Sequence, residues 1–307
     1  MLKKFLMYWM LIFLFSCSNS LSFENKIILK IENQIITSLD VNNEYKYLIA
    51  LNPSLKDSKK KDVIKFSERS IINEKIKKIE IDKNFDNPKI PESILENILK
   101  NVYSKIGLTS LDEFKRYLTI NNINYEDIKN KLIIEALWNE LIIIKFSSKI
   151  KINENDLRKR INSNKIIKSF LLSEIFFEIT DSSNLDDKFK EIKNVINDKG
   201  FEFAALKYSI SSTSNLGGKL DWINENSLNK NIITPLNNLR INEFTKPITL
   251  PGGFLILKIN DIQTDKVEID TNKELIKLKN YEKNNQLNQY SKIYFNKIKK
   301  NLEISEL

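Results

Sequence analysis

Apolar side chains recur every three to four residues through the first half of the chain, which is the spacing of helices with one buried face. The clearest run lies in residues 59–83, and a second follows Asn124 up to about residue 146. The apolar positions of the first run are Val63, Phe66, Ile71, Ile72, Ile76 and Ile79. With the shorter runs between them, these patterns predict a helical region from Ser38, as the first helix cap, to about residue 161.

Local start and stop signals divide this region into separate helices. Pro91 opens a helix through Tyr103 that closes near Gly107, the arrangement of proline first and glycine after. Ser110–Glu113 has the form of a capping box. Asn153, three residues before an aspartate, predicts the cap of a further short helix.

Short alternating segments at the two ends of the chain differ from this helical pattern. Residues 26–31 and 34–37 are rich in isoleucine and flank Glu32-Asn33, which predicts a β-hairpin. Residues 273–300 predict a long helix, and 302–305 then alternate like a strand. A lone strand cannot satisfy its own backbone hydrogen bonds, so we predict that the last strand pairs with the hairpin.

A third pattern occupies residues 171–262, where strand-like and helix-like segments alternate. Most of the glycines of the chain lie here, namely Gly200, Gly217, Gly218, Gly252 and Gly253. The order strand, helix, helix, strand, helix, strand, strand predicts a small mixed or antiparallel sheet covered by helices, with the third helix at about 234–239. The fold class is therefore α+β, a mainly helical region with an inserted sheet domain.

Composition narrows the chemistry that the chain can perform. The 307 residues contain no histidine and one cysteine, which excludes histidine-based nucleophile systems, histidine metal sites and internal disulfides. The formal net charge is +9, but the lysines are scattered and no nucleic-acid reading motif accompanies them. We expect no cofactor and no nucleic-acid partner.

The first twenty residues have the form of a secretory signal. Lys3-Lys4 precedes an apolar run over residues 5–15, which is too short to span a bilayer as an ordinary helix, and small residues follow. Export to the periplasm is expected. Two routes remain open: cleavage after Ser20, or lipid attachment to Cys17, which would give the only membrane contact.

The inserted domain resembles the parvulin-type prolyl isomerases along its whole length. The matching segments, in order, are Leu172–Phe177, Gly200–Leu206, Tyr208-Ser209 with Gly217–Trp222, Ile241–Ile248 and Gly253–Ile259. The flanks are similar to the SurA-type periplasmic chaperones, although many of those carry two such modules. The resemblance implies a signal at 1–20, a helical chaperone domain at 21–165, a parvulin-like domain at 166–262, and a C-terminal helix and strand at 263–307 that pack back on the first domain.

The resemblance also assigns site positions. The two family histidines fall on Glu174 and Leu255, and the acidic or thiol position falls on Ile210 or Ser211. All are changed, which implies weak or absent isomerase activity. For peptide binding the corresponding residues are Leu228, Ile232, Phe254 and Trp222. Each has a second interpretation, as part of the core of the module, and Glu174 has one as an ordinary hydrogen-bonded acid.

Two functions follow from these expectations. The first is a periplasmic chaperone that binds unfolded outer-membrane protein segments through apolar grooves, with an inactive parvulin domain. The second is an active prolyl isomerase, because rotation about a prolyl bond meets a barrier of about 20 kcal/mol that an apolar groove can lower without covalent chemistry. A lipid-anchored scaffold for one partner is a third possibility if Cys17 carries a lipid.

Overall fold

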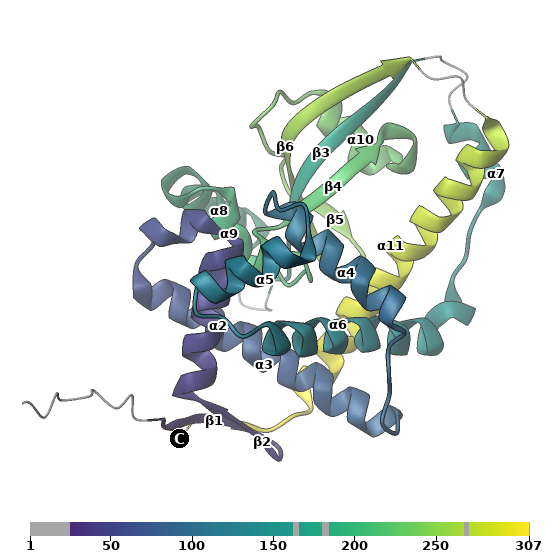
Figure 1. The fold of residues 1–307 in the computed structure, drawn as a ribbon. Helices are drawn as coiled ribbons and strands as arrows, with labels where there is room; N and C mark the ends of the chain where they lie inside the picture. Colours follow the sequence, from purple (N-terminus) through teal and green to yellow (C-terminus); the bar gives the residue numbers. More distant parts are fainter. Residues whose placement is uncertain (1–24, 162–165, 180–183, 267–269, 307) are drawn as a thin grey trace, which may run out of the picture.

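The computed structural model describes residues 25–161, 166–179, 184–266 and 270–306 (Figure 1). The expected signal at 1–20, with Cys17, lies outside the described residues. Within the described part, no helix is both long enough and apolar enough to cross a membrane.

The two ends of the described chain meet in one small sheet. Strands β1 (Ile27–Ile31) and β2 (Gln34–Thr37) form the predicted hairpin, and β7 (Ile304–Glu306) pairs with β1 on its other side. All pairings are antiparallel, with Lys30 opposite both Ile35 and Ser305. The prediction that the last strand pairs with the hairpin is confirmed. This sheet lies at the opposite end of the molecule from the tip of the inserted domain (Figure 1).

The predicted helical region is confirmed as a series of short and long helices. They are α2 (Ser38–Leu51), η1 (Pro53–Asp57), α3 (Lys60–Asn84), α4 (Glu92–Lys105), α5 (Leu111–Ile120), α6 (Tyr125–Phe146), η2 (Ser147–Lys149) and α7 (Glu154–Arg160). Asn124 and Asn153 cap α6 and α7 as predicted. The first cap is Thr37, one residue earlier than predicted, because its side chain and that of Asp40 form a reciprocal capping box that leaves Ser38 inside the helix.

The inserted domain has the predicted order of elements. They are β3 (Ile166–Phe177), α8 (Leu185–Lys199), α9 (Phe201–Tyr208), η3 (Ser214–Leu216), β4 (Lys219–Asn224), η4 (Glu225–Ser227), α10 (Lys230–Asn237), β5 (Ile248–Leu250) and β6 (Gly253–Lys266). The sheet is fully antiparallel with the order β4-β3-β6-β5. The third helix was predicted at 234–239 but begins at Lys230, because the Asn229 side chain caps it by accepting a hydrogen bond from the Ile232 amide.

The sheet of this domain separates two apolar clusters. One cluster lies under α10 and includes Phe170, Leu172, Phe176, Leu236 and Ile248. The other lies against α8 and α9 and includes Ile175, Phe177, Ile192, Phe201 and Ala204. Alternation of side chains along β3 explains this division, since residues 172 and 176 point to one face and 175 and 177 to the other.

The α9 side of the inserted domain packs on the helical region. Phe203 of α9 meets Phe66 of α3 edge to face, with ring centroids 5.2 Å apart. Arg69 of α3 donates a hydrogen bond from Nη1 to the carbonyl oxygen of Lys207 at 2.6 Å. Burial lowers the pKa of that guanidinium to about 10. The interface is therefore both apolar and hydrogen-bonded.

A single long helix, α11 (Thr271–Lys300), connects the inserted domain back to the helical region. It runs from beside α7 past α6 and α3 towards the terminal sheet (Figure 1). Its last third packs on α6, where Trp138 donates from Nε1 to Ser291 Oγ at 2.8 Å and Tyr290 stacks on Phe146 at 5.0 Å. The C-terminal helix and strand thus complete the helical region, as expected. The exact domain boundaries remain a prediction.

Candidate functional site

The changed positions of the parvulin-like module gather on one face of its sheet. On β3, Glu174 lies two residues from both Leu172 and Phe176, so the three side chains share one face of the sheet. This is the face that α10 covers. Leu255 of β6 lies directly opposite Phe176 in the antiparallel register, and it is buried in the same cluster. Two of the three positions are therefore neighbours across two paired strands.

Glu174 is the centre of a hydrogen-bonded group. Ser211 donates from Oγ to Glu174 Oε1, and Thr213 donates from Oγ1 to the same oxygen at 2.8 Å. Ser211 is buried, whereas Ile210 is exposed, so Ser211 is the one of the two residues that lies beside Glu174. A carboxylate and two hydroxyls occupy the place that the resemblance gives to an imidazole and a thiol or acid.

The loop that carries these hydroxyls is fixed by backbone contacts to β3. Ser209 Oγ accepts hydrogen bonds from the amides of Phe176 at 3.1 Å and Ser211 at 3.2 Å. The amide of Glu174 donates to the carbonyl of Gly218 at 2.8 Å. The loop on either side of Ser211 and Thr213 is therefore bonded to β3, the strand that carries Glu174.

The long helix α11 adds two residues that sequence reasoning missed. Lys292 Nζ lies 3.6 Å from the ring centroid of Phe176, and Tyr281 packs against the apolar cluster beneath α10. Burial lowers the pKa of the Lys292 ammonium, and the Glu174 carboxylate opposes that shift. Burial raises the pKa of the Tyr281 hydroxyl. No local sequence signal marks either residue, since both lie outside the module and reach it only through the packing of α11.

The expected peptide-binding residues lie in three different places. Leu228 and Ile232 are 4% and 9% exposed and pack in the cluster beneath α10. Phe254 packs on the opposite face, with its ring 5.7 Å from that of Phe177. Trp222 is 44% exposed on the edge strand β4. Of the four, Trp222 is the most exposed, Phe254 is partly buried, and Leu228 and Ile232 are buried.

This arrangement can supply charge and hydrogen bonds but no imidazole. The carboxylate of Glu174, the hydroxyls of Ser211 and Thr213 and the ammonium of Lys292 lie around one apolar face. An ammonium in such surroundings can donate a hydrogen bond to a peptide nitrogen or carbonyl, and bond rotation requires no covalent intermediate. The packing of α11 over this face restricts the room that a proline-containing segment would need.

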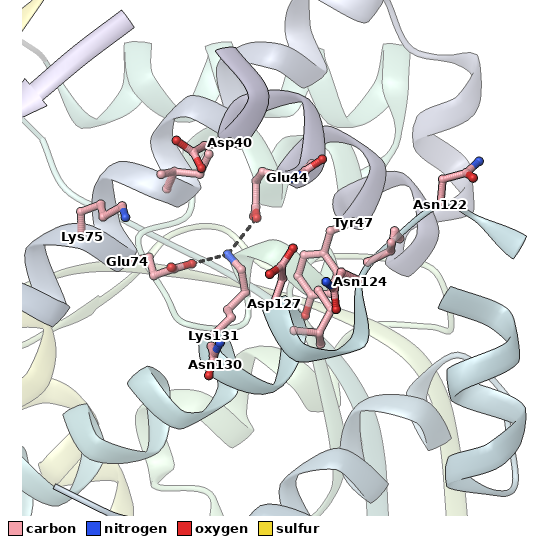
Figure 2. Close-up of a pocket in the computed structure, with 14 residues that line it drawn as sticks. Asp40, Glu44, Tyr47, Glu74, Lys75, Asn122, Asn124, Asp127, Asn130 and Lys131 are labelled. Atoms are coloured by element: carbon pink, nitrogen blue, oxygen red, sulfur yellow. Dashed lines mark ion pairs between the residues drawn. The ribbon is translucent and has the colours of Figure 1, made fainter. Parts of the chain in front are cut away.

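A second polar group lies among α2, α3 and α6 of the helical region (Figure 2). Lys131 of α6 forms ion pairs with Glu44 of α2 at 2.8 Å and Glu74 of α3 at 2.7 Å. Burial alone would lower the pKa of the Lys131 ammonium, but the two carboxylates raise it above its usual value. These residues line a pocket of about 520 Å³ between the three helices.

The same group extends into the module. Ser70 donates from Oγ to Glu44 Oε1 at 2.5 Å and accepts from Asn215 Nδ2 at 2.8 Å. Asn52 donates from Nδ2 to the carbonyl of Asn215 at 2.6 Å. Asn215 lies in η3, two residues before Gly217. The loop that leads to Gly217-Gly218 is thus tied to buried residues of α2 and α3.

Comparison with known proteins defines the class of the module. Residues 174–261 match the family model described as rotamase, the PPIC-type PPIase domain. This segment contains α8, α9, β4, α10 and β5, the end of β3 from Glu174 and most of β6. The inserted domain is therefore a parvulin-type domain, as its sequence pattern indicated.

The chain around this domain is SurA-like. It is 21% identical over 184 residues to the chaperone SurA of Pseudomonas putida, which covers 56% of this chain and 43% of that protein. It is 27% identical over 289 residues to the chaperone SurA of Buchnera aphidicola from Schizaphis graminum, which covers 86% of this chain and 64% of that protein. The chain spans less than half the length of the Pseudomonas relatives that it matches.

The solved structures that resemble this chain do so with low sequence identity and low TM-scores. A structure described with the SurA-like chaperones PEB4 and Cj1289 of Campylobacter jejuni is 17% identical and covers 92% of this chain and 99% of its own, with a TM-score of 0.35. PrsA, a peptidylprolyl isomerase from Bacillus anthracis, is 18% identical and covers 75% of this chain and 94% of its own, with a TM-score of 0.32.

Proposed function

We propose that this chain is a periplasmic holdase that binds extended apolar segments of unfolded outer-membrane proteins and lacks efficient isomerase activity. The observation that carries the proposal is which side chains occupy the parvulin-type site and how α11 covers it. The sequence resemblance assigns Glu174, Ser211 and Leu255 to the catalytic positions of the family, and α11 packs across the same sheet face. The similarity to SurA chaperones supports a chaperone role.

The open edge of the module is the proposed client surface. Strand β4 is an edge strand of the sheet, and no described strand pairs with its outer side, so its backbone groups there can pair with an added strand. Trp222 lies on this strand and is 44% exposed. Edge pairing with little side-chain specificity suits unfolded strands of many sequences. Leu228, Ile232 and Phe254 would then support the shape of the module from within.

A light-scattering assay tests the chaperone function. The mature chain, at a near-equimolar ratio, is expected to delay aggregation of an unfolded β-barrel protein diluted from urea. Replacing Trp222 with serine should raise the amount of chain needed by several-fold, since an interfacial tryptophan carries about 2 kcal/mol or more. Ile120→Ser is the matched control, because Ile120 is an 80% exposed residue of α5 on the helical region. A wild-type chain that leaves aggregation unchanged would refute the proposal.

Isomerase activity is the second candidate, favoured by the match to the PPIC-type domain and by the hydrogen-bonded group around Glu174. A protease-coupled assay on a proline peptide tests it. We expect little acceleration over the uncatalysed rate. A clear acceleration that Glu174→Gln reduces, with the fold retained by circular dichroism, would overturn our preference. Leu228→Asp is a poorer test, because Leu228 is buried and an aspartate there would disturb folding.

Export and anchoring are also proposals, drawn from the sequence before residue 25. Fractionation should place the protein in the periplasm. Mass spectrometry of the mature N-terminus then separates the two routes. Cleavage after Ser20 gives a soluble chain, whereas a diacylated Cys17 gives a lipid-anchored one.

A further inference from the structure

The pocket of about 520 Å³ between α2, α3 and α6 is strongly acidic for this chain (Figure 2). None of its lining residues belongs to the inserted domain, so it is separate from the sheet face around Glu174. Four carboxylates and two ammonium groups line it, which leaves a formal charge of −2 at neutral pH: Asp40, Glu44, Glu74 and Asp127 against Lys75 and Lys131. The chain as a whole has a formal charge of +9, so the pocket is a local exception. Its volume is large enough for a long side chain.

Two of the four carboxylates have no cationic partner in the described part of the chain. The other two hold Lys131. Asp40 Oδ2 accepts hydrogen bonds from the amide and the hydroxyl of Thr37, both at 2.8 Å, and neither of its oxygens lies in an ion pair. The side chain of Asp127 makes neither a hydrogen bond nor an ion pair with any described residue. Unpaired carboxylates around one pocket favour a positively charged ligand.

A buried hydroxyl supplies an independent sign of a ligand. Tyr47 lines the pocket and is 5% exposed, yet its hydroxyl has no hydrogen-bond partner among the described residues, which is unusual for a buried polar group. The fully enclosed side-chain atoms without partners in this part of the chain do not include that hydroxyl, so it faces the open space of the pocket. Lys131 Nζ lies 5.5 Å from the centroid of the Tyr47 ring, and Asp127 lies between the two residues in the view of Figure 2. Burial raises the pKa of the hydroxyl, so it stays protonated and can accept a hydrogen bond from a cation.

The pocket also has an apolar side, which selects the kind of cation. Ile71 of α3, Ile128 of α6 and Ile123 of the preceding loop line it. Lysine and arginine carry methylene stems that cover apolar surface while the charged head stays among polar groups. A bare metal ion needs a cluster of ligand side chains, and no group of three in the described residues could hold one. A charged head on an apolar stem therefore fits the pocket better than an inorganic ion.

We propose that this pocket binds a lysine or arginine side chain of an extended polypeptide, with the stem against the isoleucines and the charged head near Asp127 and the Tyr47 hydroxyl. The inference rests on the proposed function, because the ligand belongs to the same unfolded clients. It adds a preference for segments in which a basic residue stands among apolar ones. An ammonium and a guanidinium share the required chemistry, and the test separates them.

Peptide binding to the mature chain tests this inference. Fluorescence anisotropy would compare three extended apolar peptides with blocked ends, which differ only at a central lysine, arginine or norleucine. We expect the lysine or the arginine peptide to bind about tenfold more tightly than the norleucine peptide, and the tighter of the two identifies the preferred head group. Because the chain as a whole is positively charged, long-range electrostatics alone would give the opposite order. Equal binding of the three peptides, or tightest binding of the norleucine peptide, would overturn the proposal.

Variants locate the effect in the pocket. Asp127→Asn and Tyr47→Phe each remove one group while keeping the shape of the side chain, and each should reduce the tenfold preference to about threefold or less. Lys75→Met removes a like charge from the lining and should raise the preference by about threefold. Glu126→Gln is the matched control, because Glu126 stands beside Asp127 in the first turn of α6 but does not line the pocket, so the preference should persist.

The comparison between these variants decides the assignment. Thermal melting identifies a variant that fails to fold, and the remaining one of Asp127→Asn and Tyr47→Phe then decides. A tenfold preference that persists in either folded variant contradicts the assignment. An equal loss in Glu126→Gln also contradicts it, since that result would show a general effect of charge on α6.

The aggregation assay on the same proteins separates this inference from the proposed function. A preference for basic peptides in a chain that does not delay aggregation would leave the pocket assigned and the holdase function refuted. Delayed aggregation without any such preference would refute the pocket and leave the holdase function standing.

Discussion

Replacing Gly218 with alanine is expected to destabilise the protein far more than the same change at Gly107. Both glycines have left-handed backbones, with φ of 77° and 81°. An alanine with a left-handed backbone lowers the unfolding free energy by roughly 1–2 kcal/mol at either position, because its Cβ crowds the following carbonyl. The two sites differ in their surroundings, so the pair separates backbone strain from steric conflict.

At Gly107 an added Cβ meets nothing within 4 Å, whereas at Gly218 it would lie 2.2 Å from the carbonyl oxygen of Glu174. That oxygen belongs to β3, which is paired with β4 on one side and β6 on the other, so it cannot shift freely. The conflict would also break the bond from the Glu174 amide to Gly218, worth about 1 kcal/mol net. Displacement of the packed strands adds about 1–3 kcal/mol to the loss in unfolding free energy.

The expected loss in unfolding free energy is therefore about 3–6 kcal/mol for Gly218→Ala and about 1–2 kcal/mol for Gly107→Ala. Urea unfolding followed by tryptophan fluorescence and circular dichroism measures both. Trp222 lies on β4, four residues from the altered turn, so its fluorescence reports on the module directly. Equal losses in the two variants would refute the reasoning that the Gly218 turn is closed by contact with β3.

Two further predictions concern buried lysines. Lys131→Met should lower the unfolding free energy by about 3–5 kcal/mol, because it leaves Glu44 and Glu74 without their shared counterion, and urea titration measures the loss. Lys292→Met should make stability less dependent on pH. Burial lowers the pKa of Lys292 in the folded state, so the wild type binds fewer protons than its unfolded chain and gains stability as pH rises towards the usual lysine value of about 10.4. The stability difference between wild type and variant should therefore change as the pH rises towards this lysine value, and a constant difference would contradict this account.

The sequence predicts elements well where the signal is local. Asn124 and Asn153 cap helices because a short side chain bonds the amides two or three residues on, a contact that sequence spacing alone describes. The first helix shows the limit of such signals. Thr37 and Ser38 are both capping residues, and the reciprocal bond with Asp40 decides between them. The third helix of the module was predicted at about 234–239, whereas the cap at Asn229 makes α10 begin at Lys230.

The candidate site was predictable only in part. Glu174 and Ser211 could be assigned because the spacing of the module resembles a known family, and they do lie in contact. Thr213 was missed, although it stands in the same serine- and threonine-rich loop. Lys292 and Tyr281 could not be found from local patterns, since their place depends on how a helix from another part of the chain packs over the sheet.

The packing of the module on two sides restricts where a client can bind. Its α9 side is joined to α3 through Phe66 and Phe203, and its α10 side is partly covered by α11. Opening the second face would have to separate Lys292 from Phe176 and expose the cluster that Tyr281 covers. The outer edge of β4 needs no such rearrangement. If the chain binds unfolded segments as proposed, they are therefore expected at this edge of the parvulin-type domain, while the sheet face around Glu174 contributes to holding the molecule together.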